Sequence, residues 1–299
     1  MATGVPASYG RRRLWFLNQL DTTSSLYNIH LHLRVTGPLD SALLRRSVDE
    51  LVRRHETLRT RVVLRDGDVL QVVDPPAPAA WTGVDLSDET GPVRDEQARK
   101  TVAAHAAHGF DLAEDAPLRG LHVRLSETEH RVLLTMHHAM VDNRSVRSLE
   151  SELIALLTGG SPGREAEPGA SYADYARHQR RMRGSERWNR RRDFWRAKLE
   201  GAPERLALPE HAGWTPGSHA GGHVPFTVPE PTVAALRSLA ETGGANLFTV
   251  LLAGYAALLS ERADTSDVLV GIAVAARPGP EWGKYHRLFR QYGHRPDQC

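Results

Sequence analysis

Apolar residues return at helical spacing in several parts of the chain. In the first of these parts they lie on one face of a helix over 41–55: Leu43, Leu44, Val48, Leu51 and Val52. Asp40 comes directly before this run, where a short acidic side chain can accept hydrogen bonds from the free N–H groups of a first helical turn. The pattern predicts two further helices in this half of the chain, over 94–107 and over 146–157.

Strands are expected where apolar residues alternate with polar ones or form short runs. Two such runs, 61–64 and 69–73, flank an Asp66-Gly67 step, which supplies the positive φ angles of a tight hairpin. Two more strands are expected at 121–125 and 131–137, joined by a short polar segment. Strands that alternate with helices are typical of a mixed α/β architecture.

The second half of the chain continues with helices and one strand. Residues 171–199 have a helical and strongly basic pattern, and Pro231 opens a helix that runs to about 241. The run 245–262 is apolar nearly throughout, which predicts a largely buried helix. An apolar strand is expected at 268–274, whereas the end of the chain shows little periodicity.

Glycine and proline gather around 159–169, which is the strongest linker signal in the chain. We therefore place an N-terminal lobe at 1–160, a linker at 161–170 and a partial C-terminal lobe at 171–283. A basic tail of unclear structure follows at 284–299. The sequence thus predicts two lobes with separate cores.

The composition is that of an ordinary globular protein, with 299 residues of which 40% are hydrophobic and 25% charged. The net charge is +2, but the tail at 284–299 alone carries +3, so the rest of the chain is close to neutral and lacks the basic surface of a nucleic-acid-binding domain. The single Cys299 excludes a disulfide framework and any cysteine-based metal site. There is no apolar run of about 18 residues and no signal-peptide pattern, so we expect a cytoplasmic protein without a membrane segment.

Reactive side chains are densest at 137–145, where an apolar strand ends and a helix begins. Side chains of adjacent strand residues point to opposite faces, so His137 and His138 should lie in different surroundings. One imidazole can then face a cavity as a general base, while the other packs inward as a hydrogen-bonded core histidine. The divergence of the two rings argues against a shared metal ion. Asp142 or Asn143 can cap the following helix, and Asn143 tolerates a left-handed backbone.

The stretch 137–145 resembles the HHxxxDGxS motif of the condensation domains of nonribosomal peptide synthetases. Further motifs of this family follow the same order along the chain. Residues 8–20 resemble SxAQxRLWFLxQL, 54–60 match RHExLRT, 172–179 resemble YxDYAxWQ, and 267–281 resemble DxVVGxPVAxRxxPE. The resemblance covers residues 8 to about 281.

The resemblance implies a two-lobed chloramphenicol acetyltransferase-like fold whose N-terminal lobe is complete and whose C-terminal lobe is partial. It implies amide formation between an acyl or peptidyl thioester donor and the amine of an aminoacyl acceptor. Both substrates would arrive on phosphopantetheine arms of carrier proteins, with no cofactor bound by the domain itself. Other synthetase modules are the expected partners.

The same resemblance assigns roles to individual residues. His138 would be the base or positioning group for the amine, and His137 and Asp142 would complete the catalytic motif as structural members. Ser145 and Asn143 would support them, and Asp142 would pair with Arg277 to join the two lobes.

Four positions depart from the family motifs. Asn143 replaces glycine, Arg11 replaces glutamine, His178 replaces tryptophan and Ala273 replaces proline. The family's last motif has no counterpart here, so a C-terminally truncated domain is expected. Two alternatives to amide formation therefore stay open. One is an inactive remnant that only docks carrier proteins, and the other is an O-acyltransferase that forms esters.

Overall fold

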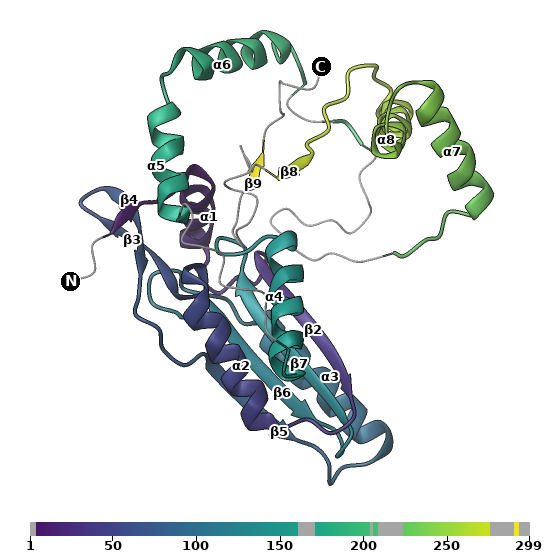
Figure 1. Ribbon diagram of the computed structural model, residues 1–299. Coiled ribbons are helices and arrows are strands. Elements are labelled where there is room, and N and C mark those ends of the chain that lie inside the picture. The colour runs from purple at the N-terminus through teal and green to yellow at the C-terminus, as the bar shows by residue number, and fades with distance from the viewer. Residues whose placement is uncertain (1–3, 161–170, 204–205, 209–223, 276–289, 293–299) are drawn as a thin grey trace. The chain divides into compact units, whose positions relative to one another are not determined.

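The computed structural model describes residues 4–160, 171–203, 206–208, 224–275 and 290–292 (Figure 1). The chain divides into two compact units. The first comprises Met1–Trp188 with Ala273–Gln291, and the second comprises Asn189–Ile272 with Tyr292–Cys299. The predicted linker 161–170 lies outside the described residues, as does all of the predicted tail except 290–292. The predicted lobe boundaries stay predictions.

The first unit alternates strands and helices. Its strands are β1 (Val5–Pro6), β2 (Asn28–Thr36), β3 (Thr60–Arg65), β4 (Asp68–Val73), β5 (Ala80–Asp85), β6 (Leu118–Arg124) and β7 (Glu129–His137). Its helices are α1 (Tyr9–Leu20), α2 (Ser41–Arg54), the 3-10 helix η1 (Glu56–Arg59), α3 (Gly91–Ala107), α4 (Asn143–Leu157) and α5 (Tyr172–Met182). The remaining elements are α6 (Glu186–Lys198), α7 (Glu230–Thr242), α8 (Leu247–Ala263), β8 (Ala273–Ala275) and β9 (Arg290–Tyr292).

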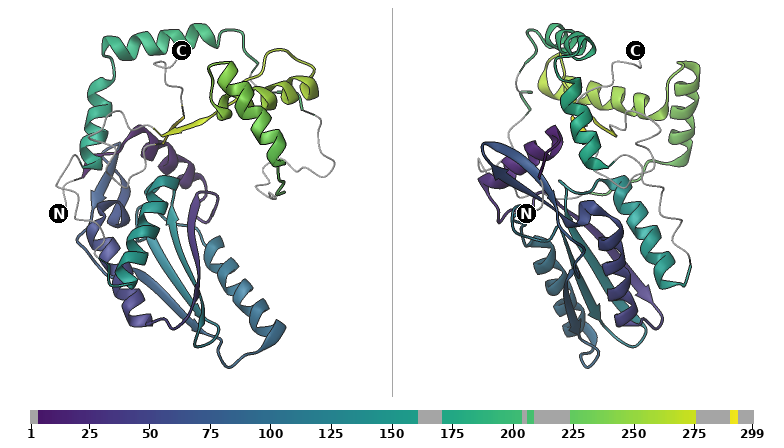
Figure 2. Two further views of the ribbon diagram at one scale, coloured as in Figure 1. Left: turned by 45° about the vertical axis from the view of Figure 1, so that its right-hand side comes forward. Right: turned by 60° about the vertical axis from the view of Figure 1, so that its left-hand side comes forward.

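A four-stranded sheet in the order β2-β7-β6-β5 forms the centre of the first unit, with β5 parallel to β6 and the other pairs antiparallel. Helices α2 and α4 pack on one face of this sheet, where Leu134 and Met136 of β7 point (Figures 1 and 2). Helix α3 covers the other face, where Leu133 lies in a smaller core. Because β7 is covered on both faces, nearly all of its side chains are buried. A second sheet has the order β1-β4-β3.

The helix and the hairpin predicted after residue 40 are confirmed. The side chain of Asp40 accepts hydrogen bonds from the backbone N–H groups of the next turn, at 2.8 Å and 3.1 Å, so α2 begins at the predicted cap. In the hairpin between β3 and β4, Arg65 pairs with Asp68. Asp66 and Gly67 have φ angles of 50° and 79°, as a tight turn of this kind requires.

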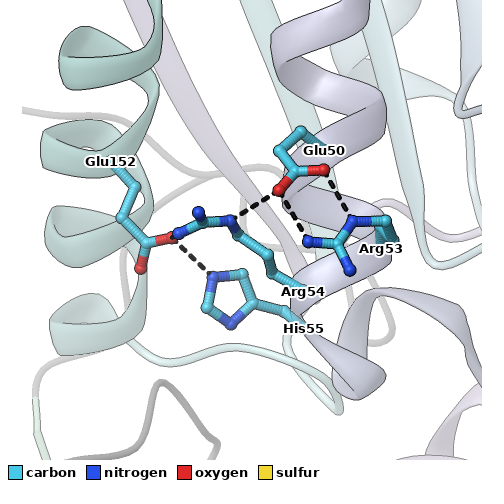
Figure 3. Close-up of polar contacts among 5 residues, drawn as sticks. All are labelled: Glu50, Arg53, Arg54, His55 and Glu152. Carbon is cyan, nitrogen blue, oxygen red and sulfur yellow. Dashed lines mark hydrogen bonds and ion pairs between the residues drawn. The ribbon is translucent and has the colours of Figure 1, made fainter. Parts of the chain in front are cut away.

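Helix α2 is fastened to α4 by side chains from the motif at 54–60 (Figure 3). His55 Nε2 lies 2.9 Å from a carboxylate oxygen of Glu152 on α4. Arg54 donates from Nε to Glu50 at 2.8 Å, and Arg53 binds the same carboxylate. These two arginine hydrogen bonds lower the pKa of Glu50 to about 2, so this carboxylate stays ionised at neutral pH.

For the second half of the chain, one expectation is wrong and another holds only in part. Helix α8 was expected to be largely buried, but none of its residues is buried among the described parts of the chain. The strand expected at 268–274 forms only over 273–275. Apolar content predicts that a segment will be covered, but the cover must come from other elements. Among the described residues, α7 packs against α8, and no partner strand lies beside 268–272.

No single helix in the described parts of the chain has the length and apolar content to cross a membrane. Helices α7 and α8 reach that threshold only as a pair, which is bent by 104° at the break between them.

Candidate active site

The two motif histidines lie at the end of the central sheet. His137 is the last residue of β7 and pairs with Asn28 at the start of β2. His138 is the first residue beyond the strand, and its backbone N–H donates to the carbonyl of Tyr27 at 2.8 Å. The backbone then turns, with Met140 N–H donating to the carbonyl of His137 at 2.9 Å, before α4 begins. The rigid central strand therefore sets where the reactive turn starts.

His137 is a neutral core histidine. Only 1% of it is exposed, and its ring centroid lies 6.1 Å from that of Tyr27 and 6.2 Å from that of Phe110. Its Nδ1 accepts the backbone N–H of Ala139 at 3.0 Å. Burial, together with the neighbouring His138, lowers the pKa of His137 to about 4. The ring is thus uncharged at neutral pH and braces the turn.

His138 has other contacts than His137, although it lies beyond the end of β7 and is itself buried, with 6% exposed. Its Nδ1 lies 2.7 Å from the backbone carbonyl oxygen of Val141. A carbonyl oxygen can only accept, so Nδ1 must carry the hydrogen and donate it. In the neutral ring the lone pair is then on Nε2, which is the tautomer that a general base needs. The hydrogen bond therefore orients the ring and sets its tautomer at the same time.

Asp142, one of the two residues predicted to cap the following helix, caps α4. Its Oδ1 accepts both the backbone N–H and the hydroxyl of Ser145, at 2.8 Å and 2.7 Å. Ser145 is 1% exposed, so its hydroxyl depends on this carboxylate inside the protein.

The left-handed backbone considered for Asn143 is not found. Asn143 is the exposed first residue of α4, and the non-glycine residues with positive φ in the described parts of the chain are Asp66 and Asp264. The extended backbone of Asp142, at φ −122° and ψ 172°, leads into the helix. Asparagine in place of the motif glycine therefore causes no backbone strain here.

Arg277 lies outside the described residues, so its pairing with Asp142 stays a prediction. No group of three or more His, Cys, Asp or Glu side chains within the described ranges is placed to hold a metal ion.

Sequence reasoning missed the part that Arg11 plays beside this turn. Arg11 is 1% exposed, and its Nε donates to the carbonyl of Ala139 at 3.0 Å. Its Nη1 donates to Gln71 of β4, and its guanidinium carbon lies 3.9 Å from the ring centroid of Tyr172. Arginines are usually exposed, so a run of three of them at 11–13 did not indicate which one points inward. The only signal for this role in the sequence was that Arg11 replaces the glutamine of the family motif.

The chain belongs to the condensation domain family, whose pattern it matches over residues 1–288. It is 34% identical over 281 residues to a linear gramicidin synthase of Brevibacillus parabrevis, an alignment that covers 92% of this chain and 5% of that protein. It is 33% identical over 282 residues to phosphinothricin tripeptide synthetase PhsC of Streptomyces viridochromogenes, covering 93% of this chain and 26% of PhsC.

Solved structures agree with the family assignment. The first condensation domain of the calcium-dependent antibiotic synthetase superposes with a TM-score of 0.76 at 23% identity, covering 97% of this chain and 68% of that one. The X-domain from teicoplanin biosynthesis superposes with a TM-score of 0.82 at 26% identity, covering 97% of this chain and 65% of that one. The predicted chloramphenicol acetyltransferase-like α/β fold is therefore confirmed. The chain spans a small fraction of its curated relatives and about two thirds of these solved chains.

Proposed function

We propose that the chain catalyses amide bond formation between an acyl or peptidyl thioester and the amine of an aminoacyl group, with His138 as the base. The observation that carries this proposal is the 2.7 Å hydrogen bond from His138 Nδ1 to the Val141 carbonyl, which puts the lone pair of the neutral ring on Nε2. Family membership supplies the reaction class. The names of the relatives, which include a tripeptide synthetase, support a peptide as product.

One base is enough to move the protons that this reaction transfers. The amine nitrogen attacks the thioester carbonyl carbon, forming the N–C bond while Nε2 of His138 takes the proton of the amine. The C–S bond then breaks, and the protonated ring gives its proton to the leaving thiolate. A neutral imidazole suits both steps because it can accept and return a proton near neutral pH.

The substrates would arrive as thioesters on the phosphopantetheine arms of carrier proteins, which are the expected partners together with other synthetase modules. The large synthetases among the relatives support this setting. His137 and Asp142 would act structurally. The first would brace the turn and the second would cap the helix that follows it.

The test uses this chain with a donor acyl carrier protein and an acceptor aminoacyl carrier protein, with the amide product measured by mass spectrometry. His138→Ala should lower the rate by about 10² to 10⁴-fold, the usual contribution of a general base. His32→Ala is the matched control because His32 is an exposed histidine on β2, and it should keep the wild-type rate. Equal rates for His138→Ala and wild type would refute the role of His138.

A second candidate is a docking domain without chemistry. The likeness to the X-domain favours it, since that domain has been solved in a complex with OxyB. Carrier binding by the wild-type chain without any product would support docking over catalysis.

An acceptor that carries a hydroxyl in place of the amine, offered in parallel, would reveal ester formation, for which the same histidine chemistry serves.

A further inference from the structure

The buried side chain of Arg11 joins three segments that are far apart in the sequence. Its Nε binds the Ala139 carbonyl in the turn that carries His138, its Nη1 binds Gln71 on β4, and its planar group stacks on Tyr172 of α5. A cation packed on an aromatic face and bonded to neutral oxygens has few alternative positions. The guanidinium is therefore held from several sides.

The backbone of Arg11 and the ring of Tyr172 are both held by contacts that do not involve the turn. The hydroxyl of Tyr172 lies 2.6 Å from Ser8 Oγ. The same Ser8 oxygen accepts the backbone N–H of Arg11 at 3.2 Å and so caps helix α1. Both the backbone from which Arg11 extends and the ring on which it stacks are thus tied to one serine. The side chain of Arg11 therefore extends to the turn from a backbone that is held in place.

The turn itself is held by hydrogen bonds between residues that are close in the sequence. Ala139 donates its N–H to His137 Nδ1, and His138 donates from Nδ1 to the Val141 carbonyl. The Ala139 carbonyl belongs to the peptide unit between these two interactions, and Arg11 binds it at 3.0 Å. Rotation of that peptide would move the Val141 carbonyl relative to the ring of His138. Holding it keeps the bond that sets the tautomer of His138.

We propose that Arg11 is a positioning residue that holds the Ala139 carbonyl and thereby keeps His138 in the Nδ1-protonated tautomer with Nε2 as acceptor. The geometry rests on the contacts above, whereas its effect on rate rests on the proposed function. Glutamine, which the family motif has at this position, is shorter, carries no charge and has one amide group. It cannot bind the turn and Gln71 and also provide a cation over Tyr172.

The experiment compares Arg11→Gln and Arg11→Lys with Arg12→Gln, an exposed arginine on the same helix. The tautomer of His138 is read from the ¹⁵N chemical shifts of its ring, assigned by comparison with His138→Ala. Rates are measured with the carrier-bound substrates, and far-UV circular dichroism checks the fold. In Arg11→Gln we expect kcat to fall about 10 to 100-fold, as for a misplaced catalytic group, with KM changed less than about twofold.

Arg11→Lys keeps the charge but not the planar fork, so it should lie between Arg11→Gln and wild type in both rate and tautomer. Arg12→Gln should match wild type in both. A folded Arg11→Gln protein with the wild-type tautomer would overturn the proposal, whatever its rate. If Arg11→Gln does not fold, a wild-type tautomer in Arg11→Lys has the same meaning. If the wild-type chain makes no amide, the proposed function fails, while the ¹⁵N shifts still decide the role of Arg11.

Discussion

The cap at Asp142 provides a quantitative test of how the reactive turn is held. In Asp142→Ala the first turn of α4 loses its side-chain acceptor, and loss of an N-cap costs about 1 kcal/mol, within a range of about 0.5 to 2. The hydroxyl of Ser145 also loses its partner inside the protein. A buried polar group without a partner costs about 1 to 3 kcal/mol. The free energy of unfolding should therefore fall by about 2 to 4 kcal/mol in total.

The measurement is thermal unfolding of the full chain, followed by near-UV circular dichroism. One kcal/mol lowers the Tm of a domain of 150 to 250 residues by about 2 to 4 °C, so Asp142→Ala should lower Tm by about 5 to 15 °C. Asp142→Asn is the matched control because asparagine caps a helix as well as aspartate does. The double variant Asp142→Ala/Ser145→Ala should recover the part of the loss that comes from the unpartnered hydroxyl, about 1 to 3 kcal/mol.

Two results would refute this reasoning. A Tm of Asp142→Ala within about 2 °C of wild type would mean that the cap contributes almost nothing. A loss in Asp142→Asn equal to that in Asp142→Ala would mean that the negative charge matters and the cap does not, in line with the predicted pairing to Arg277.

Three further predictions concern the surroundings of the turn. Because burial lowers the pKa of His137 from 6.5 to about 4, the unfolded chain binds protons first as the pH falls. The free energy of unfolding from urea titrations should thus drop between about pH 6.5 and 4 by up to about 3 kcal/mol, and His137→Asn should flatten this drop; equal slopes would contradict it. In Gly109→Ala the new Cβ would lie 2.5 Å from a backbone oxygen between α1 and β2, so the free energy of unfolding should fall by about 1 to 3 kcal/mol. Gly83→Ala is the control, because its Cβ would have nothing within 4 Å, and its loss should be smaller. Equal Tm values for the two variants would refute the collision at Gly109. Glu152→Ala removes the carboxylate that lies 2.9 Å from His55 Nε2 and should lower the free energy of unfolding by about 1 kcal/mol. An unchanged urea midpoint would show that this contact does not fasten α4 to α2.

Several elements could be predicted because their signals are local. The cap at Asp40, the Asp66-Gly67 turn and the stripe of α4 each depend on residues within a few positions of one another. Strand β2 was missed, although apolar residues alternate with polar ones along its whole length. Helix α1 was missed as well, although Ser8 stands at its cap.

Other features depended on contacts between distant segments. The apolar pattern of α8 indicated burial, yet its exposure depends on which elements lie against it. The apolar run at 268–272 has no partner strand among the described residues and stays irregular. Asn143 was considered for a left-handed backbone because of its residue type, but the extended conformation of Asp142 leads into α4 instead.

Local sequence was enough to find the reactive turn, because a buried strand, two histidines and a helix cap follow one another within ten residues. It also predicted that the two rings differ, although His138 lies beyond the end of β7, where strand alternation no longer applies. Folding decided which hydrogen-bond partners are used: His138 donates to Val141 nearby in the sequence, and Arg11 binds the distant Ala139 carbonyl. The reason is that a tautomer and a buried cation are set by hydrogen-bond partners, and the partners of Arg11 lie 60 to 161 positions away.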